Sequence, residues 1–144
     1  YKVSLIDDNI ERLGISNIDV QVYNALDKDD SLVGKADIVI ADLPCSGLGI
    51  MGRKPDIRYN ISPEKISDII RLQRDILEVV SMYVKPGGTL VYSTCTINRS
   101  ENEDNADWIC TSLGFTRDGE YVQMLPSPDK DNDGFFVARL IKNS

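Results

Sequence analysis

The chain has 144 residues, enough for one domain with a core of its own. Hydrophobic residues make up 42% and charged residues 27%, as in ordinary globular proteins, and no apolar run reaches the roughly 20 residues of a membrane-spanning helix. The net charge of −7 argues against a general nucleic-acid-binding surface. Three widely spaced cysteines and no histidine disfavour a disulfide framework or a metal site and favour a reducing cytoplasm.

The first part of the chain predicts one helix and two strands. Apolar residues at helical spacing predict a helix over Lys2–Gly14. Alternating apolar and polar residues predict a strand over Ile18–Tyr23. A β-branched apolar run predicts a buried parallel strand over Asp37–Asp42, closed by proline and glycine. Ligands in open α/β sheets bind at the carboxyl ends of such strands, so the loop that follows is a candidate site.

The middle of the chain predicts a long helix and a further strand. Ser62 is a good N-cap, and the proline after it suits the first helical position, so a helix should run to about Tyr83. Lys85–Gly88 should end the helix, and Thr89–Thr94 should be a strand. The buried side of the helix is expected to carry Ile66, Ile69, Ile70, Ile76, Leu77 and Val80.

The last part of the chain predicts a helix followed by strands. Ser100 and Glu103 have the spacing of a capping box, which predicts a helix from there to about Leu113. Phe115–Met124 is a weak strand pattern, and Asp133–Ile141 is a clear one. Strands that alternate with helices predict a mostly parallel α/β sheet, and the two closing strands suggest an antiparallel edge.

Two cysteines follow the ends of successive predicted strands, Cys45 after Asp42 and Cys95 after Thr94. If the strands are neighbours, both thiols face one crevice at the same edge of the sheet. A thiolate there is a potent nucleophile. The alternative is that both cysteines are small buried hydrophobic residues in a non-catalytic α/β interaction module. Exposure and reactivity of the thiols distinguish the two hypotheses.

Asp129–Gly134 has the D-x-D-x-D-G order that begins a calcium-binding loop. The twelfth position of such a loop needs an acidic residue, and here it is Leu140, inside a predicted strand. We therefore interpret this segment as a polar turn and expect no metal ion.

The motif Asp42-Leu43-Pro44-Cys45-Ser46-Gly47, followed about fifty residues later by Ser93-Thr94-Cys95-Thr96, resembles the paired motifs of the RNA 5-methylcytosine methyltransferases. Gly52–Arg58 and the ending Asp133–Phe136 resemble the bacterial Sun/Fmu branch, which modifies small-subunit (16S) ribosomal RNA. The resemblance covers essentially the whole chain. It implies a Rossmann-like class I fold, S-adenosylmethionine as cofactor and ribosomal RNA as substrate.

The resemblance also implies roles for the two thiols. The thiol that matches Cys95 attacks carbon 6 of a cytosine, and carbon 5 then takes the methyl group from the sulfonium. The thiol that matches Cys45 helps to resolve the covalent adduct after the carbon 5 proton leaves. A base inside folded RNA must be splayed out of its stack to reach such a site.

Further residues match positions that bind the cofactor or the RNA. Asp42 would lie at the cofactor and target-base end of its strand, where Pro44 shapes the loop. Asn24 matches a position, often Asp in the family, that contacts adenosine. The only local basic cluster, by default a solvated loop, is expected to contact phosphates and consists of Arg53, Lys54 and Arg58.

Several family features would precede Tyr1, namely the glycine-rich cofactor loop, the acidic residue that binds ribose, and a separate RNA-binding domain. We therefore expect residues 1–144 to be a single domain, the carboxyl-terminal portion of a catalytic domain that lacks its first strands. Such a fragment should bind cofactor poorly and be inactive alone, and its exposed sheet edge could form a homodimer. An adenine or protein methyltransferase is disfavoured, because it would normally have Asp/Asn-Pro-Pro-aromatic where this chain has Asp42–Cys45.

Overall fold

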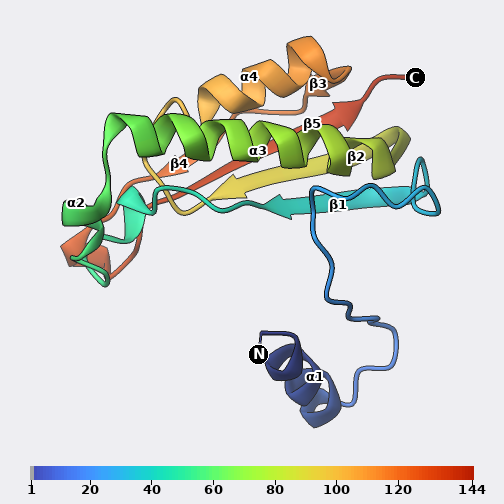
Figure 1. The fold of residues 1–144 in the computed structure, drawn as a ribbon, viewed down its shortest axis with the longest axis horizontal. Helices are drawn as coiled ribbons and strands as arrows, with labels where there is room; N and C mark the ends of the chain where they lie inside the picture. The colour runs from blue at the N-terminus through green and yellow to red at the C-terminus, as the bar shows by residue number, and fades with distance from the viewer. Residues whose placement is uncertain (1) are drawn as a thin grey trace.

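The computed structural model describes residues 2–144, whose strands form a five-stranded sheet. Its path runs from β1 (Ala36–Asp42) through β2 (Val84–Thr94) and β5 (Phe135–Lys142) to β3 (Phe115–Arg117). The short strand β4 (Val122–Met124) also pairs with β5. Helices α3 and α4 both lie over one face of this sheet (Figure 1).

The mixed α/β architecture is as predicted, with a correction to the strand directions. β1 and β2 are parallel, but β5 is antiparallel to its neighbours β2, β3 and β4. Antiparallel pairing is therefore not confined to an edge strand, because β5 lies between β2 and β3 inside the sheet. The described connections from β3 and β4 to β5 contain no helical crossover of the kind that parallel neighbours need, so β5 returns antiparallel to them and enters the sheet antiparallel to β2 as well.

The helix α3 (Pro63–Tyr83) begins as predicted, because the Ser62 side chain accepts a hydrogen bond from the Lys65 backbone N–H at 3.3 Å. The apolar face of the helix packs on the sheet, with Ile76 and Leu77 buried and the other predicted positions partly buried.

The helix α4 (Glu103–Ser112) starts later than predicted, and the capping box at Ser100 is wrong. A turn precedes the helix, in which the Asn102 backbone N–H donates to the carbonyls of Asn98 and Arg99. The Asn98 side chain accepts from the Ser100 N–H at 3.1 Å, which stabilises this turn in place of a first helical turn.

Three short helical turns lie in the loops of the fold. They are η1 (Leu48–Ile50) and α2 (Ile57–Asn60) after β1, and η2 (Pro128–Lys130) before β5. The first two lie in the segment between β1 and α3 that follows the candidate site loop.

The amino-terminal helix α1 (Lys2–Leu13) forms as predicted but lies apart from the sheet (Figure 1). Within the described residues, no α1 side chain is buried. The predicted strand over Ile18–Tyr23 is wrong, because this segment is irregular in the structure. An extended segment needs a neighbouring strand for its main-chain hydrogen bonds, and none of the five strands pairs with it.

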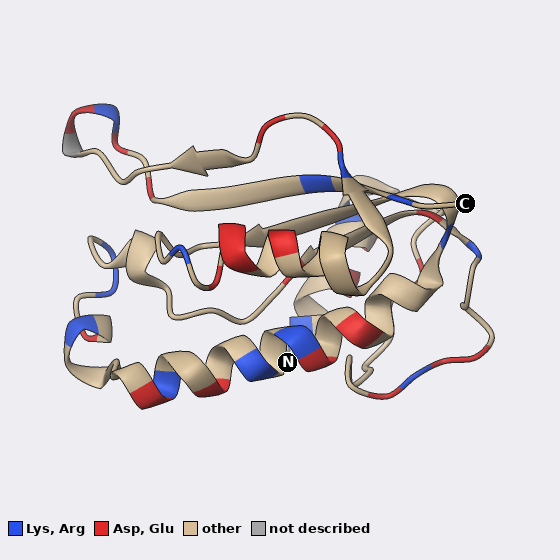
Figure 2. Ribbon diagram, turned by 90° about the horizontal axis from the view of Figure 1, so that it is seen from above, with Lys and Arg blue, Asp and Glu red and all other residues tan. Residues whose placement is uncertain are grey.

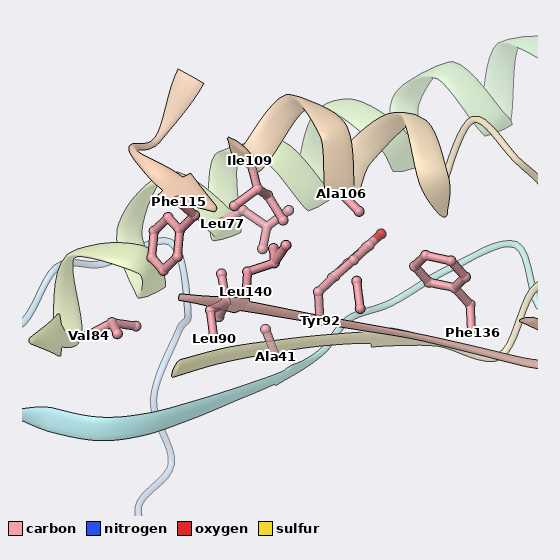
Figure 3. Close-up of a cluster of buried hydrophobic side chains, with 11 residues drawn as sticks. Ala41, Leu77, Val84, Leu90, Tyr92, Ala106, Ile109, Phe115, Phe136 and Leu140 are labelled. Carbon is pink, nitrogen blue, oxygen red and sulfur yellow. The ribbon is translucent and has the colours of Figure 1, made fainter. Parts of the chain in front are cut away.

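The apolar core lies between the sheet and the two helices (Figure 3). Leu90 and Leu140 rise from β2 and β5 and meet Leu77 and Ile109 from the helices. Tyr92 packs edge-on against Phe136, with ring centroids 6.1 Å apart. These contacts hold α3 and α4 against β2 and β5.

β1 is less buried than predicted, because helices cover only one of its faces. Ile38 is 62% exposed and Ile40 72% exposed, whereas Ala41 is buried. The outer edge of β1 pairs with no strand among residues 2–144, and its pairing with a second copy stays a prediction. None of the described helices is both long and apolar enough to span a membrane.

The one-sided packing leads to a test by denaturant unfolding. Replacing Leu77 with Ala removes a fully buried side chain and should lower the free energy of unfolding by about 3 kcal/mol. Ile40→Thr is the matched control, since it keeps β-branching on the open face and should change stability by less than about 0.5 kcal/mol. Comparable losses of unfolding free energy in the two variants would contradict the conclusion that this face of β1 is open to solvent.

Candidate active site

The parallel pairing of β1 with β2 brings Cys45 and Cys95 together, as predicted. Asp42 lies opposite Ser93 in the register, so the two strands end level. The Leu43 backbone N–H extends the pairing by donating to the Ser93 carbonyl at 3.2 Å. The two sulfurs then lie 3.2 Å apart, and both residues are partly exposed. Partial exposure favours reactive thiols over packing cysteines.

The two sulfurs differ in their surroundings. Burial, together with the hydrogen bond to the Cys95 sulfur, raises the pKa of Cys45 to about 12. Cys45 therefore stays protonated at neutral pH and can donate its S–H to the Cys95 sulfur. In that arrangement Cys45 supplies the proton and the Cys95 sulfur accepts the hydrogen bond.

Two glycines fix the loop beside Cys95. The Gly49 N–H donates to the Cys95 carbonyl at 3.1 Å, and the Gly49 carbonyl accepts from the Gly134 N–H at 2.7 Å. A Cβ atom on Gly49 would lie only 2.6 Å from the Gly134 oxygen, and one on Gly134 only 2.8 Å from the Gly49 Cα. Only glycine fits either position, which explains in physical terms the glycine of the Asp133–Phe136 motif.

Asp42 and Pro44 lie at the same edge of the sheet as the thiols. Asp42 is exposed, and its Oδ1 accepts from Ser93 Oγ at 3.1 Å. The ring of Pro44 is exposed as well, and its carbonyl accepts from Gln73 Nε2 at 2.9 Å. The carboxylate and the loop are thus held in place at the carboxyl end of β1, where α/β sheets bind ligands.

The structure does not bring Asn24 to this edge. The Asn24 carbonyl accepts from the Asp27 N–H, and the Asp27 carbonyl accepts from the Tyr83 hydroxyl at 3.4 Å, next to the amino-terminal end of β2. Three residues reach at most about 11 Å, whereas β1 is roughly 20 Å long. The contact of Asn24 with adenosine stays a prediction.

Of the three basic residues, Arg53 and Lys54 lie on the exposed loop after η1 and Arg58 lies in the short helix α2. Arg53 forms an ion pair with Asp133, with nitrogen and oxygen 3.1 Å apart, while Lys54 and Arg58 are exposed. Acidic and basic residues are interspersed along α3 (Figure 2), so positive charge does not gather on that helix. Phosphate contact by this loop stays a prediction.

A hollow of about 370 Å³ opens beside Cys45, between α2 and the start of α3. Its wall combines apolar and polar side chains, as small-molecule sites do. The lining includes Cys45, Ser46, Ile57, Asn60, Ile61 and Lys65.

Buried polar residues that the sequence analysis missed surround the thiol loops. Glu101, Asn102 and Gln73 are fully buried and form hydrogen bonds with residues next to the cysteines. One sequence signal could have found Gln73, since it lies at helical spacing among the apolar residues of α3.

Within the described residues no three His, Cys, Asp or Glu side chains are grouped as metal ligands. The segment Asp129–Gly134, whose residue order resembles the start of a calcium-binding loop, forms a turn with η2.

The raised pKa of Cys45 predicts slow alkylation. Iodoacetamide reacts with thiolates, so the alkylation rate of Cys45 should still be rising between about pH 9 and about pH 11. The unfolded chain is the control, because the alkylation rate of an ordinary thiol, whose pKa is about 8.5, has stopped rising by the upper end of this pH range. Peptide mapping by mass spectrometry measures each cysteine separately. A midpoint for Cys45 at or below about pH 9 would contradict the assignment of the proton to Cys45.

The chain resembles known ribosomal RNA methyltransferases over nearly its whole length. Ribosomal RNA small subunit methyltransferase F of Salmonella paratyphi A is 36% identical over 164 residues, an alignment covering 99% of this chain and 33% of the relative. The protein of the same name from Aliivibrio salmonicida is 32% identical over 161 residues, covering 99% and 34%. The chain thus spans about a third of the length of these curated relatives.

Solved structures share the fold. The crystal structure of PH0851 superposes with a TM-score of 0.79 at 31% identity, covering 96% of this chain and 34% of that one. NSun6 from Pyrococcus horikoshii with SFG superposes with a TM-score of 0.77 at 26% identity, covering 96% and 38%. The expected fold of class I S-adenosylmethionine-dependent methyltransferases is therefore confirmed. A sequence model described as 16S rRNA methyltransferase RsmB/F matches residues 1–141, and the chain belongs to this family.

Proposed function

We propose that the protein containing this chain methylates carbon 5 of a cytosine in ribosomal RNA, most directly 16S RNA, through a covalent adduct with Cys95. The observation that carries the proposal is the 3.2 Å separation of the two sulfurs at the carboxyl edge of the sheet. A packing role needs neither this separation nor partial exposure of both thiols. The interaction-module alternative is therefore less well supported.

Cys95 is the proposed nucleophile. Its sulfur forms a bond to carbon 6 of the cytosine, and the electrons of the carbon 5–carbon 6 double bond move to carbon 5. Bound S-adenosylmethionine supplies the methyl group that carbon 5 accepts. A base or water then takes the carbon 5 proton, the electrons of that carbon–hydrogen bond form the double bond again, and the sulfur–carbon 6 bond breaks to release Cys95.

Cys45 is proposed to help release the product. The raised pKa of its thiol makes it a proton donor at neutral pH, 3.2 Å from the sulfur that must leave. Donation of that proton to the departing Cys95 sulfur would favour breakage of the adduct. The same thiol would be a poor first nucleophile, because little of it is ionised.

The residues at the edge of the sheet fit part of a cofactor and base site. One oxygen of Asp42 accepts from Ser93, and the residue is exposed, so its carboxylate is available to a ligand at the crevice. Pro44 presents its ring beside it. Asn24 lies elsewhere in this structure, and its adenosine contact would require the segment before β1 to lie differently.

We further propose that residues 1–144 are the carboxyl-terminal part of a catalytic domain, because they cover only a third of their relatives. The negative net charge supports a main RNA-binding surface outside this chain, to which Arg53, Lys54 and Arg58 would add phosphate contacts. A chain of this length would bind S-adenosylmethionine weakly, so activity is best tested in a longer chain that includes the upstream glycine-rich loop.

In that longer chain, Cys95→Ala should lower methyl transfer to small-subunit ribosomal RNA by more than about a thousandfold, because the nucleophile is gone. Cys45→Ala should instead accumulate a covalent RNA–protein complex that survives a denaturing gel. Labelled S-adenosylmethionine and nucleoside analysis of the product measure the rate and the position of the methyl group.

The third cysteine provides the matched control. Cys110 lies on α4, away from the strand ends, so Cys110→Ala should keep both activity and turnover. Turnover by Cys95→Ala, or methylation at a position other than carbon 5, would contradict the proposed mechanism.

A further inference from the structure

We propose that Glu101 is a positioning residue that sets the geometry of the Cys45–Cys95 pair. It touches neither sulfur and acts through Ser46, the residue that follows Cys45. This positioning role is defined by the geometry of the two thiols alone. Only its consequence for methyl transfer rests on the proposed function.

Glu101 is fully buried, which is costly for a carboxylate unless its oxygens are satisfied. Four donors satisfy them. Oε2 accepts from the Ser46 backbone N–H at 2.8 Å and from Gln73 Nε2 at 3.2 Å. Oε1 accepts from Ser46 Oγ at 2.6 Å and from Asn98 Nδ2 at 3.0 Å. Every partner donates, which suits the acceptor-only carboxylate.

The carboxylate also orders a chain of hydroxyl groups across the two thiol loops. The single hydroxyl hydrogen of Ser46 is used in the hydrogen bond that Ser46 donates to Glu101. Thr96 must therefore be the donor in the 2.8 Å contact between Ser46 Oγ and Thr96 Oγ1. Thr96 Oγ1 in turn accepts from the Asn98 N–H at 3.2 Å. Ser46 and Thr96 each directly follow a cysteine, so this chain links the two loops one residue from the sulfurs.

The surroundings of Cys45 are fixed on both sides. Gln73 donates to the carbonyl of Pro44, the residue before Cys45, as well as to Glu101. Glu101 holds the backbone of the residue after it. The Cys45 side chain therefore projects from a short segment anchored at both ends.

The loop of Cys95 is fixed by the residue next to Glu101. Asn102 accepts from Thr94 Oγ1 at 2.6 Å and donates to the Thr96 carbonyl at 3.0 Å. Glu101 and Asn102 thus hold one cysteine loop each. Because Glu101 accepts from Ser46 in one loop and from Asn98 in the other, its loss should let the sulfurs move apart.

The test is the rate at which diamide joins Cys45 to Cys95 in this chain. Diamide accepts the two electrons and two protons that the thiols give up as the sulfur–sulfur bond forms. The rate depends on how the thiols face each other, and a misplacement of about 1 Å can cost about a hundredfold in a positioned reaction. Mass spectrometry of unreduced digests quantifies the linked peptides. The readout needs neither RNA nor cofactor, so failure of the proposed function would leave it unaffected.

Three variants separate positioning from general destabilisation. Glu101→Ala should slow disulfide formation by about tenfold or more. Glu101→Gln should slow the disulfide less than Glu101→Ala, since its amide oxygen can still accept from the Ser46 N–H and from Gln73 while its amide nitrogen loses the hydrogen bond from Asn98. Ile109→Ala removes a buried side chain from the core, and it should lower the melting temperature without slowing the disulfide.

Disulfide formation that is slower in Glu101→Ala than in both of the other variants would support the proposal. A wild-type rate in Glu101→Ala, or no Cys45–Cys95 disulfide in the wild type, would overturn it. Equal slowing in Ile109→Ala would show that loosening of the fold is the cause. Equal slowing in Glu101→Gln would show that the hydrogen bond to Ser46 is not the means. Either result would also overturn the proposal.

Discussion

The candidate site depends on the parallel pairing of β1 with β2. Because parallel strands run the same way and end level here, two loops fifty residues apart in the chain leave the sheet side by side. The pairing places Asp42 opposite Ser93 and lets the two cysteines approach within hydrogen-bond distance. The other neighbour of β2 is antiparallel and could not have supplied a second strand end at this edge.

Two kinds of packing support this pairing. The apolar core of Leu77, Leu90, Ile109 and Leu140 holds the helices on one face of the sheet. At the carboxyl end of the strands the buried contacts are polar, centred on Glu101. Tyr92 joins the two regions, since its ring lies in the core against Phe136 and its hydroxyl donates to the Glu101 carbonyl. Apolar contacts have little directionality, whereas hydrogen bonds fix angles and distances, as a reactive pair of thiols requires.

Much of the fold, and the pairing of the two thiols, could be predicted from local sequence patterns. Apolar periodicity, the Ser62 cap and the β-branched runs gave α3, β1, β2 and β5, and the position of the cysteines after two strands gave the thiol pair. The expected strand over Ile18–Tyr23 did not form, since alternation of residues specifies a face but supplies no partner strand. Glu101 was missed because its partners come from α3 and both loops, and the Ser100–Glu103 spacing resembled a helix cap.

Above all, we propose that Cys95, and not Cys45, forms the bond to the cytosine. The most direct measurement is to isolate the RNA–protein complex of the Cys45→Ala variant of the longer chain, digest both components and locate the linked nucleotide by mass spectrometry. We expect a cytosine nucleotide attached to the peptide that contains Cys95. Attachment at Cys110 or at a residue other than cysteine, or formation of the same complex when Cys95 is also replaced by alanine, would contradict it.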